Sequence, residues 1–136
     1  MGAMNEAEMA AEPATAARIA ESPGRGRGVF ARRVMRAGTV IERAPVLVMP
    51  RSDLLPLRGK LLDDYWFWWD DEHSACALGW ASLYNHACPS NATFRLLHDV
   101  RMIEFTAVRD IAIGEEITIN YQGEPDDPTP PWFVSR

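Results

Sequence analysis

The chain has little of what extracellular, metal-binding and membrane-spanning proteins use. Of its 136 residues only two are cysteine, Cys76 and Cys88, which form one bridge at most and cannot complete a four-ligand zinc site without other donors. No apolar run approaches the ~18 residues that a membrane span needs, and no segment has the pattern of a secretory leader. We therefore expect a soluble intracellular protein, in the cytoplasm, nucleoid or nucleus according to its source, with free thiols, no metal and no membrane association.

Positive charge is also scarce. Lys and Arg number 14 against 19 Asp and Glu, so the net charge is −5. Direct binding to nucleic acid depends on cationic patches that neutralise phosphates, and this composition argues against it. An acidic protein suits a basic partner instead, although acidity for solubility alone is the competing explanation.

The length of the chain allows one domain with a compact core. Residues 1–17 are rich in Ala and Glu, hold one proline and contain no aromatic residue. We expect them to be a disordered tail or the remnant of a tag, and we expect the folded domain to span residues 18–136.

Short apolar runs broken by Gly and Pro favour β-structure over a helical bundle. We expect strands at 29–31, 39–41, 46–49, 102–108 and 117–121. In the last of these Ile117, Ile119 and Tyr121 share one face, opposite Thr118 and Asn120. Helical spacing of Leu61, Leu62, Tyr65, Trp66 and Trp69 predicts a helix over 61–69, and a second short helix is expected over 78–84. The prediction is a mainly β fold with one or two short helices.

Three segments contain residues that could carry chemistry, and the first is a glycine-rich loop. Gly24, Gly26 and Gly28 alternate with Arg25 and Arg27, and such glycines allow positive φ and close approach of a ligand to the backbone. The loop is not a nucleotide P-loop, because no Gly-Lys-Ser/Thr follows and the next element is a strand. Taken alone, the pattern favours a tight turn without a ligand and with solvated arginines.

The second segment, residues 84–91, reads Tyr-Asn-His-Ala-Cys-Pro-Ser-Asn and is rich in turn-forming residues. Such a turn can present backbone and amide groups to a polar ligand. A nucleophilic Cys88 with His86 as its base is an alternative, but the two residues are only two positions apart and no third orienting group is evident. A metal site at His86 and Cys88 would need further ligands, which only His73, His98 and Cys76 offer. We disfavour both alternatives.

The third segment, residues 114–121, reads Gly-Glu-Glu-Ile-Thr-Ile-Asn-Tyr. Adjacent glutamates at the start of a strand point to opposite faces, so a solvated turn explains Glu115 and Glu116 better than acid–base chemistry does. Taken alone, Tyr121 is expected to be a core aromatic residue with its hydroxyl at the edge.

In this order, the three segments resemble the motifs of the SET-domain lysine methyltransferases: Gly-Arg-Gly-Val-Phe-Ala, then Asn-His-x-Cys ending in Asn, then Gly-Glu-Glu-Ile-Thr-x-x-Tyr. The match runs from about Ile19 to the C-terminus, so the resemblance identifies 18–136 as a SET domain. Residues 62–65, 77–79 and 110–118 are similar to the minimal SET protein of chlorella viruses. That relative is a dimeric, stand-alone histone-lysine methyltransferase without zinc-binding flanks, and the low cysteine count agrees with it.

The resemblance implies a SET-like β-clip fold of small sheets with a C-terminal pseudoknot, in which the last strand and the tail pass beneath the Asn-His loop. It also implies the site. S-adenosylmethionine would be bound by Gly26, Arg27, Gly28, Asn85, His86, Tyr121 and Trp132. Tyr121 and Tyr65 would be the catalytic residues, and Tyr65, Tyr84 and Ile119 would line the channel for the substrate lysine.

The implied function is S-adenosylmethionine-dependent methylation of a lysine on a basic protein, a histone or histone-like tail, by a homodimer. Ile119 stands where many relatives carry a Phe or Tyr that limits the number of methyl groups, so more than one methylation is expected. The chain also departs from the family pattern at four positions: Ala87, an early Pro89, and Arg27 and Pro131 in place of two tyrosines of the viral relative. These departures keep open a second hypothesis, a non-catalytic SET-like module that binds a peptide.

Two further groups flank Tyr65. The first is acidic and consists of Asp63, Asp64, Asp70, Asp71 and Glu72; it either attracts a Lys/Arg-rich tail or forms a solvated helix face. The second is the aromatic run 66–69, which is more than one helix face can bury in a small core and predicts a self-association surface.

Overall fold

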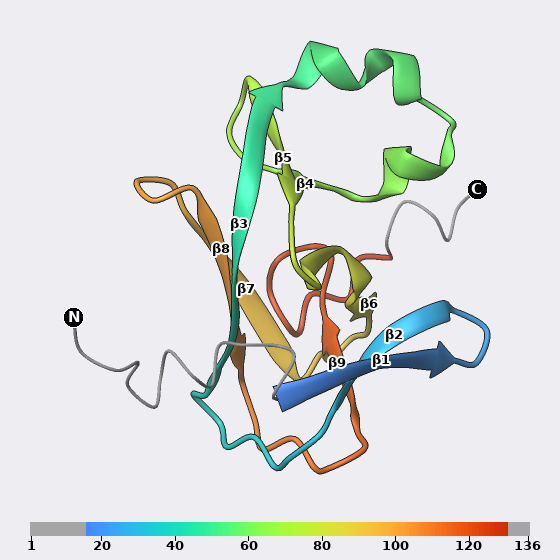
Figure 1. The fold of residues 1–136 in the computed structure, drawn as a ribbon, viewed down its shortest axis with the longest axis vertical. Coiled ribbons are helices and arrows are strands. Elements are labelled where there is room, and N and C mark those ends of the chain that lie inside the picture. Colours follow the sequence, from blue (N-terminus) through green and yellow to red (C-terminus); the bar gives the residue numbers. More distant parts are fainter. Residues whose placement is uncertain (1–15, 131–136) are drawn as a thin grey trace.

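A computed structural model describes residues 16–130 and shows a mostly β architecture, which confirms the expected fold class (Figure 1). The strands are β1 (Ala17–Ser22), β2 (Gly26–Ala31), β3 (Val40–Pro50), β4 (Trp66–Trp68), β5 (His73–Ala77), β6 (Asn85–His86), β7 (Ala92–Leu97), β8 (Met102–Ala107) and β9 (Glu116–Ile119). The helical segments are the 3-10 turns η1 (Arg51–Leu57), η2 (Leu61–Asp64) and η3 (Ala81–Leu83). The expectation for 1–17 lies almost wholly outside the described residues.

The strands form two sheets. One has the order β1-β2-β9-β6 and the other β4-β5-β3-β8-β7. The glycine loop is the turn of the β1–β2 hairpin, β9 pairs antiparallel to β2, and the short β6 pairs parallel to β9. The four-stranded sheet therefore brings together all three segments that carry the family resemblance.

The chain crosses itself next to β6, where the segment after β9 runs against the 86–90 loop (Figure 1). The Tyr121 backbone N–H donates to His86 Nδ1 at 3.0 Å, and the Ser90 N–H donates to the Pro125 carbonyl at 3.2 Å. The side chains of Cys88 and Asn120 both donate to the Asp127 carbonyl, at 3.1 and 2.9 Å. These bonds hold the end of the domain against the Asn-His loop, as the expected pseudoknot requires.

The two strands expected at 39–41 and 46–49 are one continuous strand, β3. β3 pairs with β8 from Val40 to Pro45 and with β5 from Val46 to Pro50. Pro45 has no N–H to donate, and it stands where β3 exchanges one partner for the other. Its presence therefore does not break the strand.

The helix expected over 61–69 is wrong. Only Leu61–Asp64 forms a 3-10 turn, and Trp66–Trp68 is β4, the edge strand paired with β5. Aromatic residues favour strands, and β4 alternates: the Phe67 ring packs against Phe94 and Phe105, at centroid distances of 5.5 and 6.2 Å, while Trp68 is 58% exposed. The second expected helix, 78–84, contains only the short turn η3.

The core lies between the sheets and includes both faces of β9. Ile117 and Ile119 are buried on one face, as the alternation predicts, but Thr118 and Asn120 on the other face are buried as well. The loop that carries Asn91 covers that second face. Within 16–130, no helix has the length and apolar character that crossing a bilayer demands.

Candidate active site

Two cavities meet at Tyr121. The first, here called the aromatic cavity, has a volume of about 510 Å³, and the second, the polar cavity, about 710 Å³. Rings and aliphatic groups dominate the lining of the first: Tyr65, Trp66, Phe67, Trp68, Tyr84, Phe94, Leu96, Ile119 and Tyr121. The glycine loop and the Asn-His segment line the second: Glu21, Gly24, Arg25, Gly26, Arg27, Asn85 and His86. Asp64, Tyr65, Ser82 and Tyr121 border both cavities.

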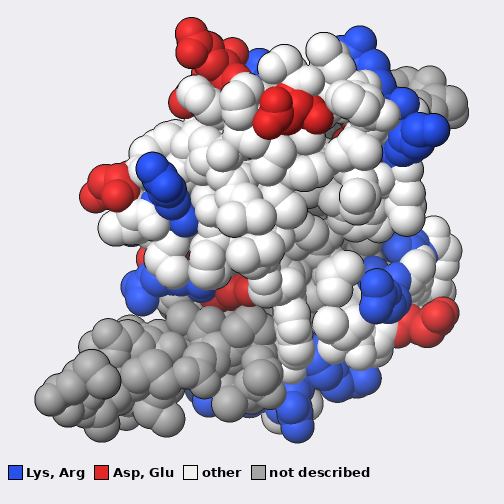
Figure 2. Space-filling model, turned by 45° about the horizontal axis from the view of Figure 1, so that its top comes forward, with Lys and Arg blue, Asp and Glu red and all other residues white. Residues whose placement is uncertain are grey.

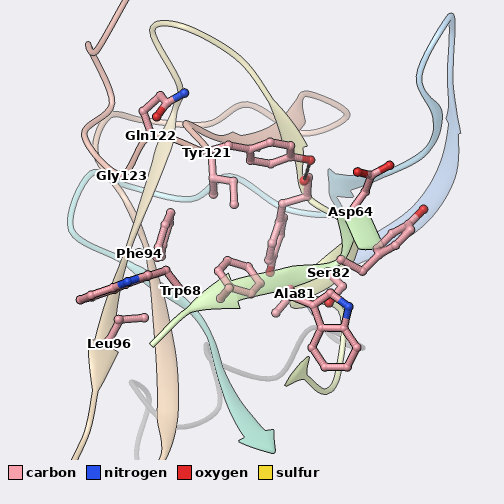
Figure 3. Close-up of a pocket in the computed structure, with 14 residues that line it drawn as sticks. Asp64, Trp68, Ala81, Ser82, Phe94, Leu96, Tyr121, Gln122 and Gly123 are labelled. Carbon is pink, nitrogen blue, oxygen red and sulfur yellow. Dashed lines mark hydrogen bonds between the residues drawn. The ribbon is translucent and has the colours of Figure 1, made fainter. Parts of the chain in front are cut away.

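Tyr121 lies two residues after the end of β9, and both its backbone N–H and its hydroxyl are held by hydrogen bonds. Its hydroxyl donates to the Tyr84 carbonyl at 2.8 Å, and its backbone N–H donates to His86 Nδ1. Burial raises the pKa of the phenol to about 12, and the nearby Tyr65 hydroxyl adds to this effect. The phenol therefore stays protonated near neutral pH, and its oxygen keeps lone pairs to accept a hydrogen bond. In Figure 3 the hydroxyl points toward the end of the cavity where Asp64 lies, whereas Phe94, Trp68 and Leu96 lie at the other end.

His86 is a neutral imidazole in this arrangement. Burial, and then the positive charge of Arg25, lower its pKa. Because Nδ1 accepts the Tyr121 N–H, the ring proton of the neutral form belongs on Nε2. The imidazole therefore holds the catalytic candidate through its acceptor nitrogen.

Glu116 is the centre of a network beneath the polar cavity, and the expectation that it is a solvated turn residue is wrong. Its side chain is 12% exposed. One carboxylate oxygen accepts from Ser22 Oγ at 2.8 Å and from Arg25 at 2.7 Å, and the other accepts from Asn85 Nδ2 at 2.7 Å. The sequence favoured a solvated Arg25, but this side chain also donates to the His86 carbonyl at 2.9 Å. Three segments distant in sequence are thus joined by one carboxylate.

Glu115 is likewise engaged. It accepts from Arg109 at 2.7 Å, from the Ala112 N–H at 3.0 Å and from Asn91 Nδ2 at 3.2 Å. The hydrogen bond from Arg109 is the largest cause of the lowered pKa of this carboxyl group. Both glutamates are structural, which the sequence pattern alone did not indicate.

A protein-family model described as "SET domain" matches residues 26–122. The chain belongs to the SET-domain family. It is 30% identical over 105 residues to a histone-lysine N-methyltransferase of Schizosaccharomyces pombe specific for lysine 37 of histone H3, a match that covers 76% of this chain and 71% of the relative. Family membership and this relative support the expected enzyme class, a protein-lysine N-methyltransferase.

Solved structures confirm the SET-like fold. A proposed histone methyltransferase of Plasmodium falciparum superposes with a TM-score of 0.64 at 23% identity, over 87% of this chain and 96% of that chain. The structure of ctPRC2 in an autoinhibited conformation bound to S-adenosylmethionine gives a TM-score of 0.67 at 21% identity, over 78% of this chain and 15% of that one. The structure of ctPRC2 in complex with H3K27me3 and H3K27M gives 0.68 at 22%, over 78% and 14%.

The structure brings most of the SET-derived site residues together. Tyr121, Tyr65, Tyr84 and Ile119 line the aromatic cavity, and Gly26, Arg27, Asn85 and His86 line the polar one. Tyr84 is 1% exposed and its hydroxyl turns away from the cavity to Glu42, so its backbone carbonyl is the group that meets Tyr121. Trp132 and Pro131 lie outside the described residues.

Gly28 lines neither cavity. A Cβ at this position would overlap the Glu116 carboxylate and lie 2.9 Å from Asn85 Nδ2. The glycine is therefore needed for the close packing of β2 against that network, and its expected contact with the methyl donor remains a prediction.

Sequence reasoning missed one wall of the aromatic cavity. Phe67, Trp68, Phe94, Leu96 and Gln122 also line it. The run 66–69 carried the signal, but the expected helix placed these rings wrongly. In the structure Trp66, Phe67 and Trp68 form β4, and all three line the cavity.

The thiol and metal alternatives find no support in the arrangement. The Cys88 thiol contacts the Asp127 carbonyl, and His86 Nδ1 is occupied by the Tyr121 N–H. Across residues 16–130, no three His, Cys, Asp or Glu side chains are grouped so as to hold a metal ion.

Proposed function

We propose that this SET-domain chain transfers a methyl group from S-adenosylmethionine to the side-chain amine of a lysine on a basic protein. The observation that carries the proposal is the meeting of the aromatic and polar cavities at the Tyr121 hydroxyl. Such an arrangement lets two reactants enter from different sides and meet at one polar atom.

The residues of the polar cavity fit the methyl donor. Its volume of about 710 Å³ lies within the range of cofactor sites. Arg25 and Glu21 offer both signs of charge to a zwitterionic amino-acid group, and Asn85, His86 and the loop backbone offer hydrogen-bonding groups. Gly24 and Gly26, with φ of 76° and 74°, leave open space where a Cβ would stand, so a ligand can approach this backbone.

The donor, when bound, supplies a methyl group on a positively charged sulfur. The chain's own contribution is to place a neutral amine in line with that group, and positioning of this kind contributes up to ~7–11 kcal/mol in well-oriented systems. The rings of the aromatic cavity fit the apolar stem of lysine and stabilise a methylated ammonium through their faces. Because the Tyr121 proton is committed to the Tyr84 carbonyl, the phenol oxygen accepts the amine N–H and orients its lone pair.

Tyr121 does not serve as the base. A phenol with its pKa raised to about 12 has no tendency to lose a proton near neutral pH, and as an acceptor it needs none. We propose that the amine loses its proton to water before the reactants close on one another.

We propose a histone or histone-like tail as the substrate and an intracellular location for the protein. The Schizosaccharomyces pombe relative is named for a lysine of histone H3, and the net charge of −5 suits a basic partner. On the face shown in Figure 2, acidic and basic side chains are both scattered around a largely uncharged middle. Asp64, which lines both cavities, is an acidic group placed at the site itself.

We further propose that the enzyme adds more than one methyl group and acts as a homodimer. Ile119 lines the aromatic cavity and leaves more room than a ring would. Large apolar side chains are exposed in β4 and in the two 3-10 turns that precede it: Leu55 57%, Leu61 77%, Leu62 52% and Trp68 58%. Light scattering of the full chain tests the homodimer. Mass spectrometry of the product tests the number of methyl groups, and strict monomethylation would contradict the expectation of more than one. The likeness to the dimeric viral protein stays a prediction from sequence.

The decisive experiment is incubation of the full chain with labelled S-adenosylmethionine and a panel of basic proteins, beside Tyr121→Phe. We expect transfer by the wild type and a loss of roughly 10²-fold or more in the variant, in line with removal of one preorganised polar group. Calorimetry with the donor distinguishes this enzyme from the second hypothesis, a non-catalytic peptide-binding module. A module that does not bind the donor would show neither heat of binding nor methyl transfer.

A further inference from the structure

A buried carboxylate lies behind the active site, and neither the family motifs nor the mechanism above uses it. Glu42 is 2% exposed, on β3. A β-bulge between Val40 and Glu42 shifts the register against β8 at this point, and Ile41 and Glu42 are buried in succession. Bulges of this kind redirect a side chain, often next to an active site.

Glu42 holds both ends of one short segment. Its Oε2 accepts the Trp80 backbone N–H at 3.0 Å and its Oε1 accepts the Tyr84 hydroxyl at 2.8 Å. Between these anchors lies η3, whose Ser82 borders both cavities. The preceding Gly79 has φ of 68°, and a Cβ there would overlap the Glu42 carboxylate, so the turn needs a glycine to approach so closely.

The same segment ends at the group that receives the catalytic hydroxyl. The Tyr84 ring is buried and packs against Phe105 at 4.8 Å, and the Tyr84 carbonyl accepts the Tyr121 hydroxyl at 2.8 Å. A continuous chain of contacts therefore runs from Glu42 to the Tyr84 hydroxyl, through the rigid tyrosine to its carbonyl, and on to Tyr121.

We propose that Glu42 is a positioning residue for methyl transfer, which sets the place of the Tyr121 hydroxyl by anchoring Trp80 and Tyr84. This inference rests on the proposed function for its kinetic consequence, but its structural content does not. Burial of a carboxylate is costly, and burial raises the pKa of Glu42 even though both hydrogen bonds lower it. Because burying the Glu42 carboxylate costs free energy, we expect it to have a role beyond packing.

The test compares Glu42→Ala, Tyr84→Phe and Glu42→Gln in the full chain, with Glu104→Ala as the matched control. Glu104 is also a buried glutamate with two partners, Arg43 and Arg95, and both partners lie outside the 80–84 segment. We expect kcat to fall about tenfold or more in Glu42→Ala and Tyr84→Phe, because displacements near 1 Å cost up to about 10²-fold. Donor affinity should fall less than kcat, since Glu42 itself lies outside the polar cavity and only Ser82 and Leu83 of the anchored segment line it.

Glu42→Gln should recover most of the rate, because its amide accepts from Trp80 and donates to the Tyr84 oxygen. The control should lose stability but keep kcat. Equal kcat in wild type and Tyr84→Phe, measured well below the unfolding temperature, would overturn the proposal, as would an equal loss in Glu104→Ala.

A second readout does not depend on activity. The chain has three tyrosines, so ¹³C-labelled tyrosine gives three ring signals, and Tyr121→Phe assigns one of them. Glu42→Ala and Tyr84→Phe should shift the Tyr121 signal, whereas Glu104→Ala should not. If the Tyr121 signal shifts but the wild type transfers no methyl group, Glu42 positions Tyr121 and the proposed function is refuted. If the wild type is active but the signal does not move, the proposed function stands and the role of Glu42 is refuted.

Discussion

At the scale of single residues, His86 connects the protonation state of the protein to the place of Tyr121. Its Nδ1 accepts the Tyr121 N–H only while that nitrogen carries no proton. Burial and Arg25 lower the folded-state pKa of His86 below the ordinary value of 6.5. The unfolded chain therefore binds more protons than the folded one between the two pKa values, so stability rises with pH through that window and is lost as pH falls through it.

As pH falls from about 7, we expect the wild type to lose more free energy of unfolding than His86→Gln, because Gln accepts the same N–H without titrating. Urea unfolding at several pH values measures the difference. The carboxyl groups with lowered pKa, such as Glu115, titrate at more acidic pH and contribute little in this range. Equal losses in both proteins would contradict the assignment.

Asn91, like His86, uses its side chain to pair with backbone groups, here those of β9. It is 2% exposed, its Oδ1 accepts the Thr118 N–H at 2.8 Å, and its Nδ2 donates to the Glu116 carbonyl at 2.7 Å. Asn91→Ala leaves both β9 groups buried without these partners, and we expect a loss of about 3 kcal/mol in unfolding free energy. Arg36→Ala, which removes an exposed ion pair at 3.4 Å, should change stability by less than about 1 kcal/mol. A similar effect of both substitutions in urea unfolding would refute this role.

At the scale of elements, the glycine-rich hairpin has two kinds of glycine with different consequences. Gly24 and Gly26 need positive φ beside open space, whereas Gly28 needs space between Glu116 and Asn85. We expect Gly28→Ala to cost about 2 kcal/mol by overpacking and to weaken donor binding as the network shifts. Gly38→Ala, at φ of 90° with nothing nearby, should cost about 1 kcal/mol of backbone strain and leave donor binding unchanged. Urea unfolding measures the stability of both variants, and calorimetry measures their affinity for the donor. Unaltered donor affinity in Gly28→Ala would contradict the link between Gly28 packing and donor binding.

The elements also show what sequence pattern can and cannot predict. The alternation in 102–108 and 117–121 predicted β8 and β9, because the apolar face of each strand packs in the core; it did not predict that polar residues on their other faces, such as Thr118 and Glu104, are buried too. The spacing in 61–69 matched a helix equally well, and only the pairing of β4 with β5 decides for a strand. Pairing between segments distant in sequence is a tertiary property, so the local pattern could not supply it.

The same limit applies to the site. The order of three motifs was enough to predict that Tyr121, Asn85 and His86 come together. The roles of Glu116, Arg25 and Glu42 were not predictable, because each depends on partners 31 to 94 residues away. A charged residue before a strand looks the same in sequence whether solvent or an arginine from another hairpin meets it.

At the scale of the whole molecule, the net charge of −5 raises the question of how the proposed basic substrate would reach the cavities. The acidic residues around Tyr65 divide into different roles in the structure. Asp70 accepts the Glu72 and His73 N–H groups in the turn between β4 and β5, and Asp63 accepts the Gly59 N–H. Asp64 borders both cavities, so it is the member of the group placed to attract a cationic chain to the site.

We expect Asp64→Asn to raise KM for a basic peptide about fivefold at low salt, because one exposed charge a few ångströms from another is worth roughly 1 kcal/mol in water. The difference should shrink at about 0.5 M salt, where exposed charges are screened within a few ångströms, and kcat should change less than KM. Asp99→Asn, in the turn between β7 and β8, removes the same charge from a residue that lines neither cavity and should leave both constants unchanged. If Asp64→Asn and Asp99→Asn alter KM equally, the protein attracts its substrate through net charge and not through the carboxylate beside the cavities.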